Sequence, residues 1–372
     1  MINFKKILMD MKNYKIIGLM SGTSMDGLDI AFLDFQKKDK DWVFTILKGE
    51  TVPLSKELHQ DFLSIQSKTI EEFKQLDIAF GIWMGEQVNQ FIENHQIDKT
   101  QIVAIASHGQ TLFHQPQHGF TIQVGCGTAL AYTSGLNVVN DFRSLDVLAG
   151  GQGAPLVPIG DFKLFRRFAD SFLNLGGFAN ISLEKEGKII AFDIAPLNLP
   201  LNFMVAKLGE PYDFQGRYAR SGKVLPELLH ALNQLGFYRE SPPKSLGTEW
   251  LEQEFMQLMP LNEEVNNVLR TLVEHQAIQI VNVLSEQNLS SVFITGGGAY
   301  NHFLIERIRD LYSGEIIIPE DQLIQFKEAL VFGFLAVLYF ENETNTLASV
   351  TGAEKNLITG VFHRSQDFEF PN

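Results

Sequence analysis

The sequence predicts a two-lobed α/β protein, and three observations support this prediction. The chain has 372 residues, more than a single hydrophobic core usually organises. A strand, a glycine turn and a second strand occur at residues 14–34 and again at residues 171–194. Apolar residues recur at helical spacing between and after these hairpins. We therefore expect duplicated lobes, with residues 1–135 and 345–372 in the first and residues 136–344 in the second.

Composition and charge exclude several classes of protein. Hydrophobic content of 45% with 20% charged residues is typical of a soluble globular protein, and the net charge of −14 argues against a nucleic-acid interface, which needs a basic patch. With Cys126 alone, no intrachain disulfide is possible, which suits a reducing cytoplasm. The N-terminus lacks the pattern of a signal peptide, and the most apolar run, residues 329–340, is too short to span a bilayer. We expect a cytoplasmic protein without a membrane partner.

The turn of the first hairpin carries more polar groups than a connection requires. It consists of Gly22, Thr23, Ser24, Met25, Asp26, Gly27, Leu28 and Asp29. Successive backbone N–H groups in a glycine-rich turn can bind an anion, and a neighbouring carboxylate can hold the Mg²⁺ that accompanies a nucleotide. The turn therefore predicts a phosphate site. The alternative is a hairpin whose polar residues satisfy only its own backbone.

An amphipathic helix is predicted over residues 70–95, followed by a short buried strand at residues 102–106. Polar residues 107–111 follow this strand, where α/β proteins place ligand-binding groups. His108, His114 and His118 lie six and four residues apart, which is not a zinc-ligand pattern. We expect these histidines to form hydrogen bonds at the edge of a cleft.

Residues 140–158 form a second dense polar patch. Asp141, Arg143 and Asp146 precede a Gly-Gly-Gln-Gly turn that contains Gln152. Arginine binds carboxylates and phosphates well because its planar guanidinium donates parallel hydrogen bonds. Arg143 is thus either an anion-binding residue or half of an Asp–Arg salt bridge at a domain boundary, and both interpretations stay open at this point.

Two more glycine turns lie in the second half of the chain. Gly176 and Gly177 occupy the turn of the second hairpin, in the place of Gly22 in the first. Gly296, Gly297 and Gly298 follow a predicted strand at residues 291–295 and precede a predicted helix at residues 302–311. A glycine run between a strand and a helix N-terminus often binds a nucleotide, because free N–H groups point at the ligand.

Two carboxylates are candidates for catalysis. Asp193 lies at the end of a predicted strand, and burial at such a place can tune its pKa for a general base. Glu328 stands directly before the apolar run at residues 329–340, which we interpret as a buried helix. Glu328 either caps this helix or points into the cleft. The sequence has no Walker A loop, no G-x-S-x-G around Ser21 or Ser24, and no H-E-x-x-H.

Eight motifs in fixed order give a more specific signal than any one turn. They read GLMSGTSMDGLDIA, SHGQTLFHQP, VNDFRSLDVLAGGQGAPLVP, NLGGFANIS, YDFQGRYARSG, TGGGAYN, KEALVFGFLA and SVTGA. Together they resemble the anhydro-N-acetylmuramic acid kinase family, over nearly the whole chain. The resemblance implies the fold of the sugar kinase/Hsp70/actin superfamily: two actin-like (RNase H-like) α/β lobes with a nucleotide cleft between them.

The resemblance also implies a reaction. In this family, water opens the 1,6-anhydro bond at C1 while O6 accepts the γ-phosphoryl group of ATP, which gives N-acetylmuramic acid 6-phosphate and ADP in cell-wall recycling. The family's base lies in a segment that usually reads F-D-T-G-P-G-N, and here it reads F-D-I-A-P-L-N at residues 192–198. Asp193 is kept, but Ala195 and Leu197 replace both glycines. These replacements predict a reshaped sugar pocket.

Roles follow from the resemblance residue by residue. The first turn, from Gly22 to Asp29, would bind the phosphates of ATP, with Asp26 anchoring Mg²⁺. The glycines of the second half would bind phosphate and adenosine, Asp193 would be the base, and Glu328 would help orient the water. Asp141, Arg143 and Gln152 would bind the sugar, with Arg143 on its lactyl carboxylate.

The resemblance also implies a homodimer. Two alternative functions stay open. The first alternative is a kinase of another sugar or amino sugar on the same fold. The second is an ATP-driven binding protein of the Hsp70 or actin type, although the chain has no appended peptide-binding domain.

Overall fold

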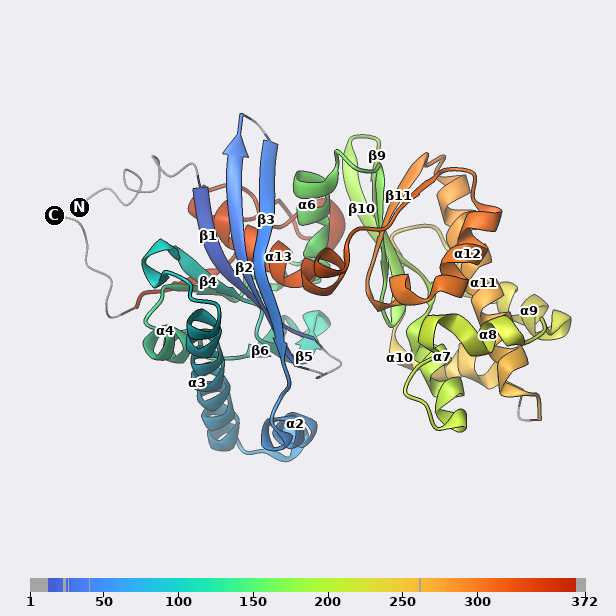
Figure 1. The fold of residues 1–372 in the computed structure, drawn as a ribbon, viewed down its shortest axis with the longest axis horizontal. Helices are drawn as coiled ribbons and strands as arrows, with labels where there is room; N and C mark the ends of the chain where they lie inside the picture. Colours follow the sequence, from blue (N-terminus) through green and yellow to red (C-terminus); the bar gives the residue numbers. More distant parts are fainter. Residues whose placement is uncertain (1–12, 23–24, 26, 40, 261, 366–372) are drawn as a thin grey trace. The chain divides into compact units, whose positions relative to one another are not determined.

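The computed structural model describes residues 13–22, 25, 27–39, 41–260 and 262–365 and forms two compact units (Figure 1). Unit 1 comprises Met1–Leu164 and Phe326–Asn372, and unit 2 comprises Phe165–Gln325. The boundaries therefore differ from the expected 135/136 and 344/345. The reason is that residues 138–140 pair with the first sheet, and the apolar run after Glu328 packs in unit 1.

Unit 1 contains a six-stranded sheet in the order β13-β7-β4-β1-β2-β3. Its strands are β1 Asn13–Ser21, β2 Leu28–Lys38, β3 Asp41–Val52, β4 Ala104–Ser107, β7 Val138–Asn140 and β13 Val361–His363. β2 pairs antiparallel with β1 and β3, and β4 runs parallel to β1 and β7. A separate pair, β5 Gln110–Gln115 and β6 Phe120–Val124, follows β4.

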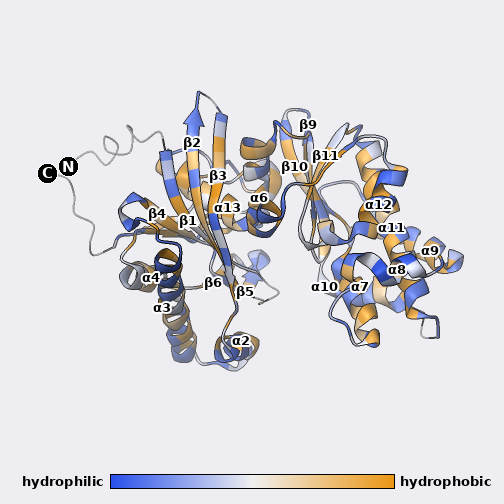
Figure 2. Ribbon diagram, viewed as in Figure 1, coloured by the Kyte–Doolittle hydropathy of each residue, from blue (hydrophilic) through white to orange (hydrophobic). Residues whose placement is uncertain are grey.

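Helices cover both faces of this sheet. α3, Ile70–Asn94, begins at a capping box of Thr69 and Glu72 and belongs to one core cluster with Ile17 and Leu19 of β1. Gly18, which alternates with these residues, lies against Ala329 of α13, Asp321–Phe340, so α3 and α13 pack on opposite faces. Figure 2 shows α3 with hydrophobic and hydrophilic residues mixed along its length, as expected of an amphipathic helix. The shorter helices are α2 Lys56–Leu63, α4 Gly127–Ser134, α5 Ser144–Leu148, α6 Val157–Gly160 and α14 Ala348–Thr351.

α13 is long and apolar enough in composition to cross a membrane, but 78% of its apolar window is buried inside the protein. We therefore interpret it as the core helix predicted from its apolar run. The helix begins at Asp321 rather than near residue 329. Glu328 is consequently the eighth residue of the helix, about two turns from its start, so the interpretation that it caps the helix is wrong.

Unit 2 repeats the strand order of unit 1. Its strands are β8 Ser171–Leu175, β9 Phe178–Lys185, β10 Lys188–Pro196, β11 Ser291–Thr295 and β12 Glu315–Ile317. The order β10-β9-β8-β11-β12 has two antiparallel pairs and then two parallel pairs, as has β3-β2-β1-β4-β7. This shared topology confirms the duplicated α/β fold predicted from the two hairpins.

The helices of unit 2 are α7 Asn198–Val205, α8 Arg217–Ser221, α9 Pro226–Asn233, α10 Thr248–Trp250, α11 Val265–Glu286 and α12 His302–Leu311. The buried face of α11 packs with the sheet in one core cluster. α12 begins and ends at the residues predicted for this helix, 302 and 311.

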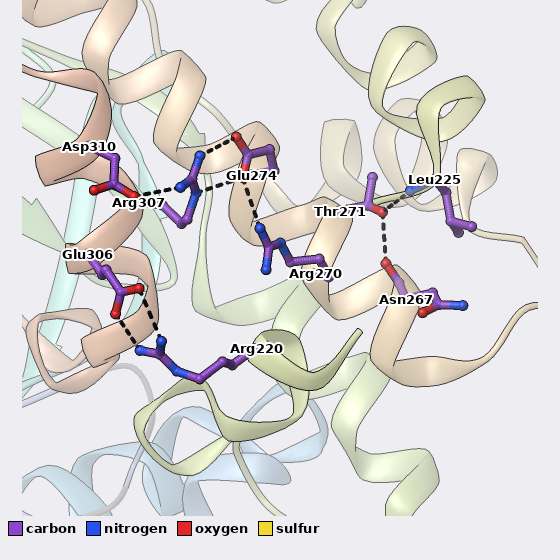
Figure 3. Close-up of polar contacts among 9 residues, drawn as sticks. All are labelled: Arg220, Leu225, Asn267, Arg270, Thr271, Glu274, Glu306, Arg307 and Asp310. Carbon is purple, nitrogen blue, oxygen red and sulfur yellow. Dashed lines mark hydrogen bonds and ion pairs between the residues drawn. The ribbon is translucent and has the colours of Figure 1, made fainter. Parts of the chain in front are cut away.

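Ion pairs connect α8, α11 and α12 on the surface of unit 2 (Figure 3). Arg220 of α8 binds both carboxylate oxygens of Glu306 on α12, at 3.1 and 2.6 Å. Arg307 of α12 likewise binds Glu274 of α11, at 2.9 and 3.1 Å. The guanidinium groups of Arg220 and Arg270 each lie 4.7 Å from the centre of the Phe303 ring. These contacts fix the start of α12 against its neighbours.

Candidate functional site

Arg143 is the centre of a polar cluster in unit 1. Its Nε and one terminal nitrogen donate to Nε2 of His108 at 3.1 and 2.9 Å, and its other terminal nitrogen donates to the Gly153 carbonyl at 2.7 Å. Because Nε2 of His108 accepts, its proton must lie on Nδ1, which is 2.9 Å from the Gly109 carbonyl. Burial, and secondarily the charge of Arg143, lower the pKa of His108 to about 3. His108 is therefore a neutral hydrogen-bonding residue, as expected from its sequence context.

The guanidinium of Arg143 retains binding capacity. Burial lowers its pKa to about 10, against the opposing charges of Glu328 and Asp146, so it stays protonated at neutral pH. It has five N–H groups, and two of them have no acceptor among the described residues. No ion pair joins Arg143 to Asp141 or Asp146 in this part of the chain, so the salt-bridge interpretation has no support.

The turn after Arg143 is held by Asp146. This fully buried carboxylate accepts from the Gly153 N–H at 2.8 Å and from the Thr351 hydroxyl at 2.7 Å. Asp141 has a positive φ of 53°, and one of its carboxylate oxygens accepts from the N–H of Ser144, the first residue of α5, at 3.1 Å. The Gln152 side chain is exposed. Gln152 and the second carboxylate oxygen of Asp141 thus remain available for a ligand, and both residues are close to Arg143 in sequence.

Glu328 faces the same cluster from α13. The residue is exposed to solvent, yet the protein around it raises its pKa, and the charges of Arg143 and Lys327 oppose that rise. We interpret this combination as a carboxylate in a recess. The negative charge of Asp29 also raises the pKa of Glu328. One oxygen of Asp29 accepts from the Thr51 hydroxyl at 2.6 Å.

The predicted phosphate turn lies only partly within the described residues. Ser21 at its start is buried and donates to Gln110 at 2.6 Å, and the Met25 N–H donates to the Gly22 carbonyl at 3.1 Å. Met25 has a positive φ of 57°. Thr23, Ser24 and Asp26 lie outside the described residues. The roles assigned to this turn therefore stay predictions.

In unit 2, the glycine turn of the second hairpin is tied to the segment that follows Asp193. The carbonyl of Gly177 accepts from the Leu197 N–H at 2.8 Å, and the carbonyl of Gly176 is 3.3 Å from the Asn198 N–H. The sequence thus brings together two of its predicted site segments at one end of β9 and β10.

In the third glycine run, close packing requires glycine at two positions, Gly296 and Gly298. Gly296 has a φ of +85°, and a Cβ there would lie 2.6 Å from Oδ1 of Asn174. A Cβ on Gly298 would lie 2.7 Å from the side chains of Leu175 and Leu197. The run does not open α12 directly, because a 3₁₀ turn at Gly297–Tyr300 intervenes and the Asn301 side chain caps the Leu304 N–H at 3.1 Å. The prediction of free helical N–H groups at this run is therefore wrong in part.

A cavity of about 420 Å³ lies beside this run. Its lining is aromatic and amide-rich, and Asp213, its one carboxylate, already accepts from two backbone N–H groups. The lining residues are Asn198, Leu201, Asn202, Tyr212, Asp213, Phe214, Gln215, Gly297, Tyr300, Asn301 and His302. A pocket of this size that is lined by aromatic side chains and a few amides suits a nucleoside. Sequence reasoning missed most of this lining, although the motif YDFQGRYARSG contains part of it.

Asp193 lies near the end of β10. Its carboxylate Oδ2 accepts from the Leu246 N–H at 2.8 Å, and its own N–H donates to the Lys244 carbonyl at 3.0 Å. Burial raises the pKa of Asp193, and the hydrogen bond from Leu246 partly opposes that rise. One oxygen is thus fixed, while no described residue bonds the other.

The residues that replace the family's glycines beside Asp193 are buried. Ala195 and Leu197 are fully inaccessible to solvent and belong to the core cluster of unit 2. Their side chains fill core space, so the prediction that they reshape a sugar pocket gains no support.

The described residues contain no group of three or more histidine, cysteine, aspartate or glutamate side chains placed to hold a metal ion. Mg²⁺ bound with a nucleotide commonly takes only one or two carboxylates and completes its shell with phosphate and water. Asp26, the predicted ligand, lies outside the described residues, and Asp29 at the end of the same turn supplies a carboxylate oxygen of the kind such a site uses.

Comparison with known proteins gives a consistent match. A family model described as anhydro-N-acetylmuramic acid kinase matches residues 14–365. An anhydro-N-acetylmuramic acid kinase from Pseudomonas fluorescens (strain Pf0-1) is 36% identical over 93% of this chain and 98% of the relative. One from Sulfurovum sp. (strain NBC37-1) is 37% identical over 94% and 99%, and one from Coxiella burnetii (strain Dugway 5J108-111) is 33% identical over 97% and 100%. A solved ROK family glucokinase from Streptomyces griseus in complex with glucose and AMPPNP is 14% identical over 86% of this chain and 98% of that chain, with a TM-score of 0.38.

Proposed function

The chain belongs to the anhydro-N-acetylmuramic acid kinase family, and from this premise we propose that it opens 1,6-anhydro-N-acetylmuramic acid with water and phosphorylates O6. The products would be N-acetylmuramic acid 6-phosphate and ADP. The proposal extends to a cytoplasmic homodimer that acts in cell-wall recycling. A kinase of another sugar is not favoured, because the altered residues beside Asp193 pack in the core.

The observation that carries the proposal is the environment of Asp193. A base that activates water must be ionised at the working pH yet basic enough to accept a proton. Burial raises the pKa of Asp193, while the Leu246 N–H at 2.8 Å stabilises the ionised form and fixes one oxygen. The other oxygen would accept the proton of the water that attacks C1.

The sugar would be bound by residues of unit 1. Arg143 supports this role because it is charged, fixed through His108 and Gly153, and retains two N–H groups for a carboxylate. Asp141 and Gln152 would bind hydroxyl and amide groups of the sugar. Glu328, with its raised pKa, would help orient the water.

The nucleotide would be bound by both glycine-rich regions. The cavity beside Gly297 would hold adenosine, and the turns at Gly176, Gly177 and at residues 22–29 would bind phosphates. Asp26 would hold Mg²⁺ together with ATP, and the ion would neutralise charge on the transferring phosphoryl group. Backbone N–H groups of the turns would orient that group toward O6.

Mass spectrometry of the product tests this proposal. The protein is incubated with Mg-ATP and 1,6-anhydro-N-acetylmuramic acid. Ring opening with phosphorylation adds one water and one phosphoryl group to the sugar, whereas an ordinary sugar kinase adds only the phosphoryl group. ATP turnover without any phosphorylated sugar would contradict the proposal and favour an ATP-driven binding protein.

A further inference from the structure

The loop at residues 240–246 of unit 2 is bonded to Asp193, the proposed base, although no residue of the loop has a role in the proposed reaction. This loop follows a short 3₁₀ helix, Gly236–Arg239, and leads to α10. It contacts Asp193 twice, because the Lys244 carbonyl accepts from the Asp193 N–H and the Leu246 N–H donates to the carboxylate. The position of the loop therefore sets the position and the basicity of Asp193.

The side chain of Lys244 ties this loop to the core. Its Nζ donates to the Phe237 carbonyl at 2.9 Å and lies 4.4 Å from the centre of the Phe237 ring. Phe237 itself is buried against Trp250, with ring centres 5.5 Å apart. The ammonium thus has one hydrogen bond and one cation–π contact to a rigid residue. Glu240 and Glu286 are the carboxylates that face it electrostatically.

The loop has open space beside it. A cavity of about 280 Å³ is lined by Glu240, Pro242 and Lys244 of the loop and by residues of β10 and α11. Close packing would hold a loop by many small contacts. Beside a cavity, a loop has fewer packing contacts and depends more on the few strong contacts that remain. The contact of Lys244 with Phe237 is one of these.

We propose that Lys244 is a positioning residue for Asp193: by holding the loop against Phe237, its ammonium keeps the Leu246 N–H on the carboxylate. Lys244 itself makes no contact with the carboxylate through its side chain in the structure. The proposal rests on the proposed function, in which Asp193 is the base.

The test compares Lys244→Met, which keeps the length and apolar stem, with Lys244→Arg, which keeps the charge and donors. Lys244→Met should lower kcat about 10-fold or more, because the base loses a charge-assisted hydrogen bond, and should leave both KM values unchanged. Without the Leu246 N–H the pKa of Asp193 rises, so the acid limb of the kcat–pH profile should move to higher pH. Lys244→Arg should restore most of both properties.

Lys188→Met is the matched control, since Lys188 is an exposed lysine at the other end of β10. It should leave kcat and the acid limb as in the wild type. If Lys244→Met fails to fold, as judged by circular dichroism, Lys244→Gln takes its place. An unmoved acid limb with wild-type kcat in the folded variant would overturn the positioning role.

A separate variant distinguishes this failure from failure of the proposed function. If Asp193→Asn is inactive while Lys244→Met behaves as wild type, only the positioning role is excluded. If Asp193→Asn retains full activity, the base assignment itself is wrong.

Discussion

The replacement of Arg143 by alanine tests how the sugar acid is bound. In the structure the guanidinium makes three hydrogen bonds, two to Nε2 of His108 and one to the Gly153 carbonyl, and it retains two N–H groups. If those two groups bind the lactyl carboxylate, Arg143→Ala removes a charge-assisted hydrogen bond to the substrate. The KM for the sugar should then rise while the KM for ATP stays near its original value.

The size of the effect follows from the strength of such a hydrogen bond. A hydrogen bond to a charged group contributes about 1.5–3 kcal/mol, which corresponds to a roughly 10- to 150-fold rise in the KM for the sugar. The substitution also leaves Nε2 of His108 without its donor in a site where that residue is only 6% exposed. This costs about 1–3 kcal/mol of unfolding free energy, which a domain of ordinary stability tolerates.

The assay measures ADP release at varied sugar concentration, below the melting temperature of the variant. A sugar analogue that lacks the lactyl carboxylate serves as the internal control, because its binding should depend much less on Arg143. Equal losses on the two sugars would refute the reasoning and leave Arg143 with a structural role in holding His108 and the turn at Gly153.

Three further predictions concern the metal, the base and the buried histidines. Asp26→Asn should weaken the use of Mg-ATP strongly while the fold survives, since it removes a carboxylate that neutralises phosphate charge; unchanged kinetics in a folded variant would exclude the role. Asp193→Asn should lower kcat by about two to four orders of magnitude with binding retained, and in the wild type kcat should fall as pH drops through the raised pKa, because protonation disables a base. Burial lowers the folded-state pKa of His108, and of His275, a fully buried residue of α11, to about 3. Below pH ~6.5 each histidine therefore binds a proton in the unfolded state but not in the folded state, so stability that is complete above pH ~6.5 is lost as pH falls. Each of these two histidines should lower the unfolding free energy by about 2 kcal/mol between pH 7 and pH 5, as measured by urea denaturation. Equal unfolding free energies at the two pH values would contradict this.

Much of the fold could be predicted because its signals are local. The hairpin at residues 14–34 became β1 and β2, and the helix at residues 302–311 became α12, since alternation and helical spacing are written in adjacent residues. The repeated glycine hairpin also predicted the duplication that the two sheets confirm.

The remaining features depend on contacts between distant segments. β7 has three residues and joins the first sheet only by pairing with β4 and β13, so the lobe boundary could not be read locally. The start of α13 was missed because its first two turns mix apolar residues with polar ones and lack the continuous apolar run that follows residue 328. Tyr212 and Phe214 gave no periodic signal, since they lie in an irregular stretch, and only the structure brings them to the cavity beside Gly297.

The same limit applies to the candidate site. The sequence identified Arg143 as an anion clamp but left the salt-bridge alternative open, because nothing local shows that its partner is His108, 35 residues earlier. It identified Asp193 as a base but gave no sign of the Leu246 N–H, which lies 53 residues further on.

The most direct test of the central claim is the position of solvent oxygen in the product. The reaction is run in ¹⁸O-labelled water with Mg-ATP and the anhydro sugar, and the sugar phosphate is analysed by mass spectrometry at short times. If Asp193 activates water for attack on carbon, the label should appear at the C1 hydroxyl, and the phosphate on O6 should be unlabelled. Label found only in inorganic phosphate would mean that water attacks ATP, and it would contradict the ring-opening kinase.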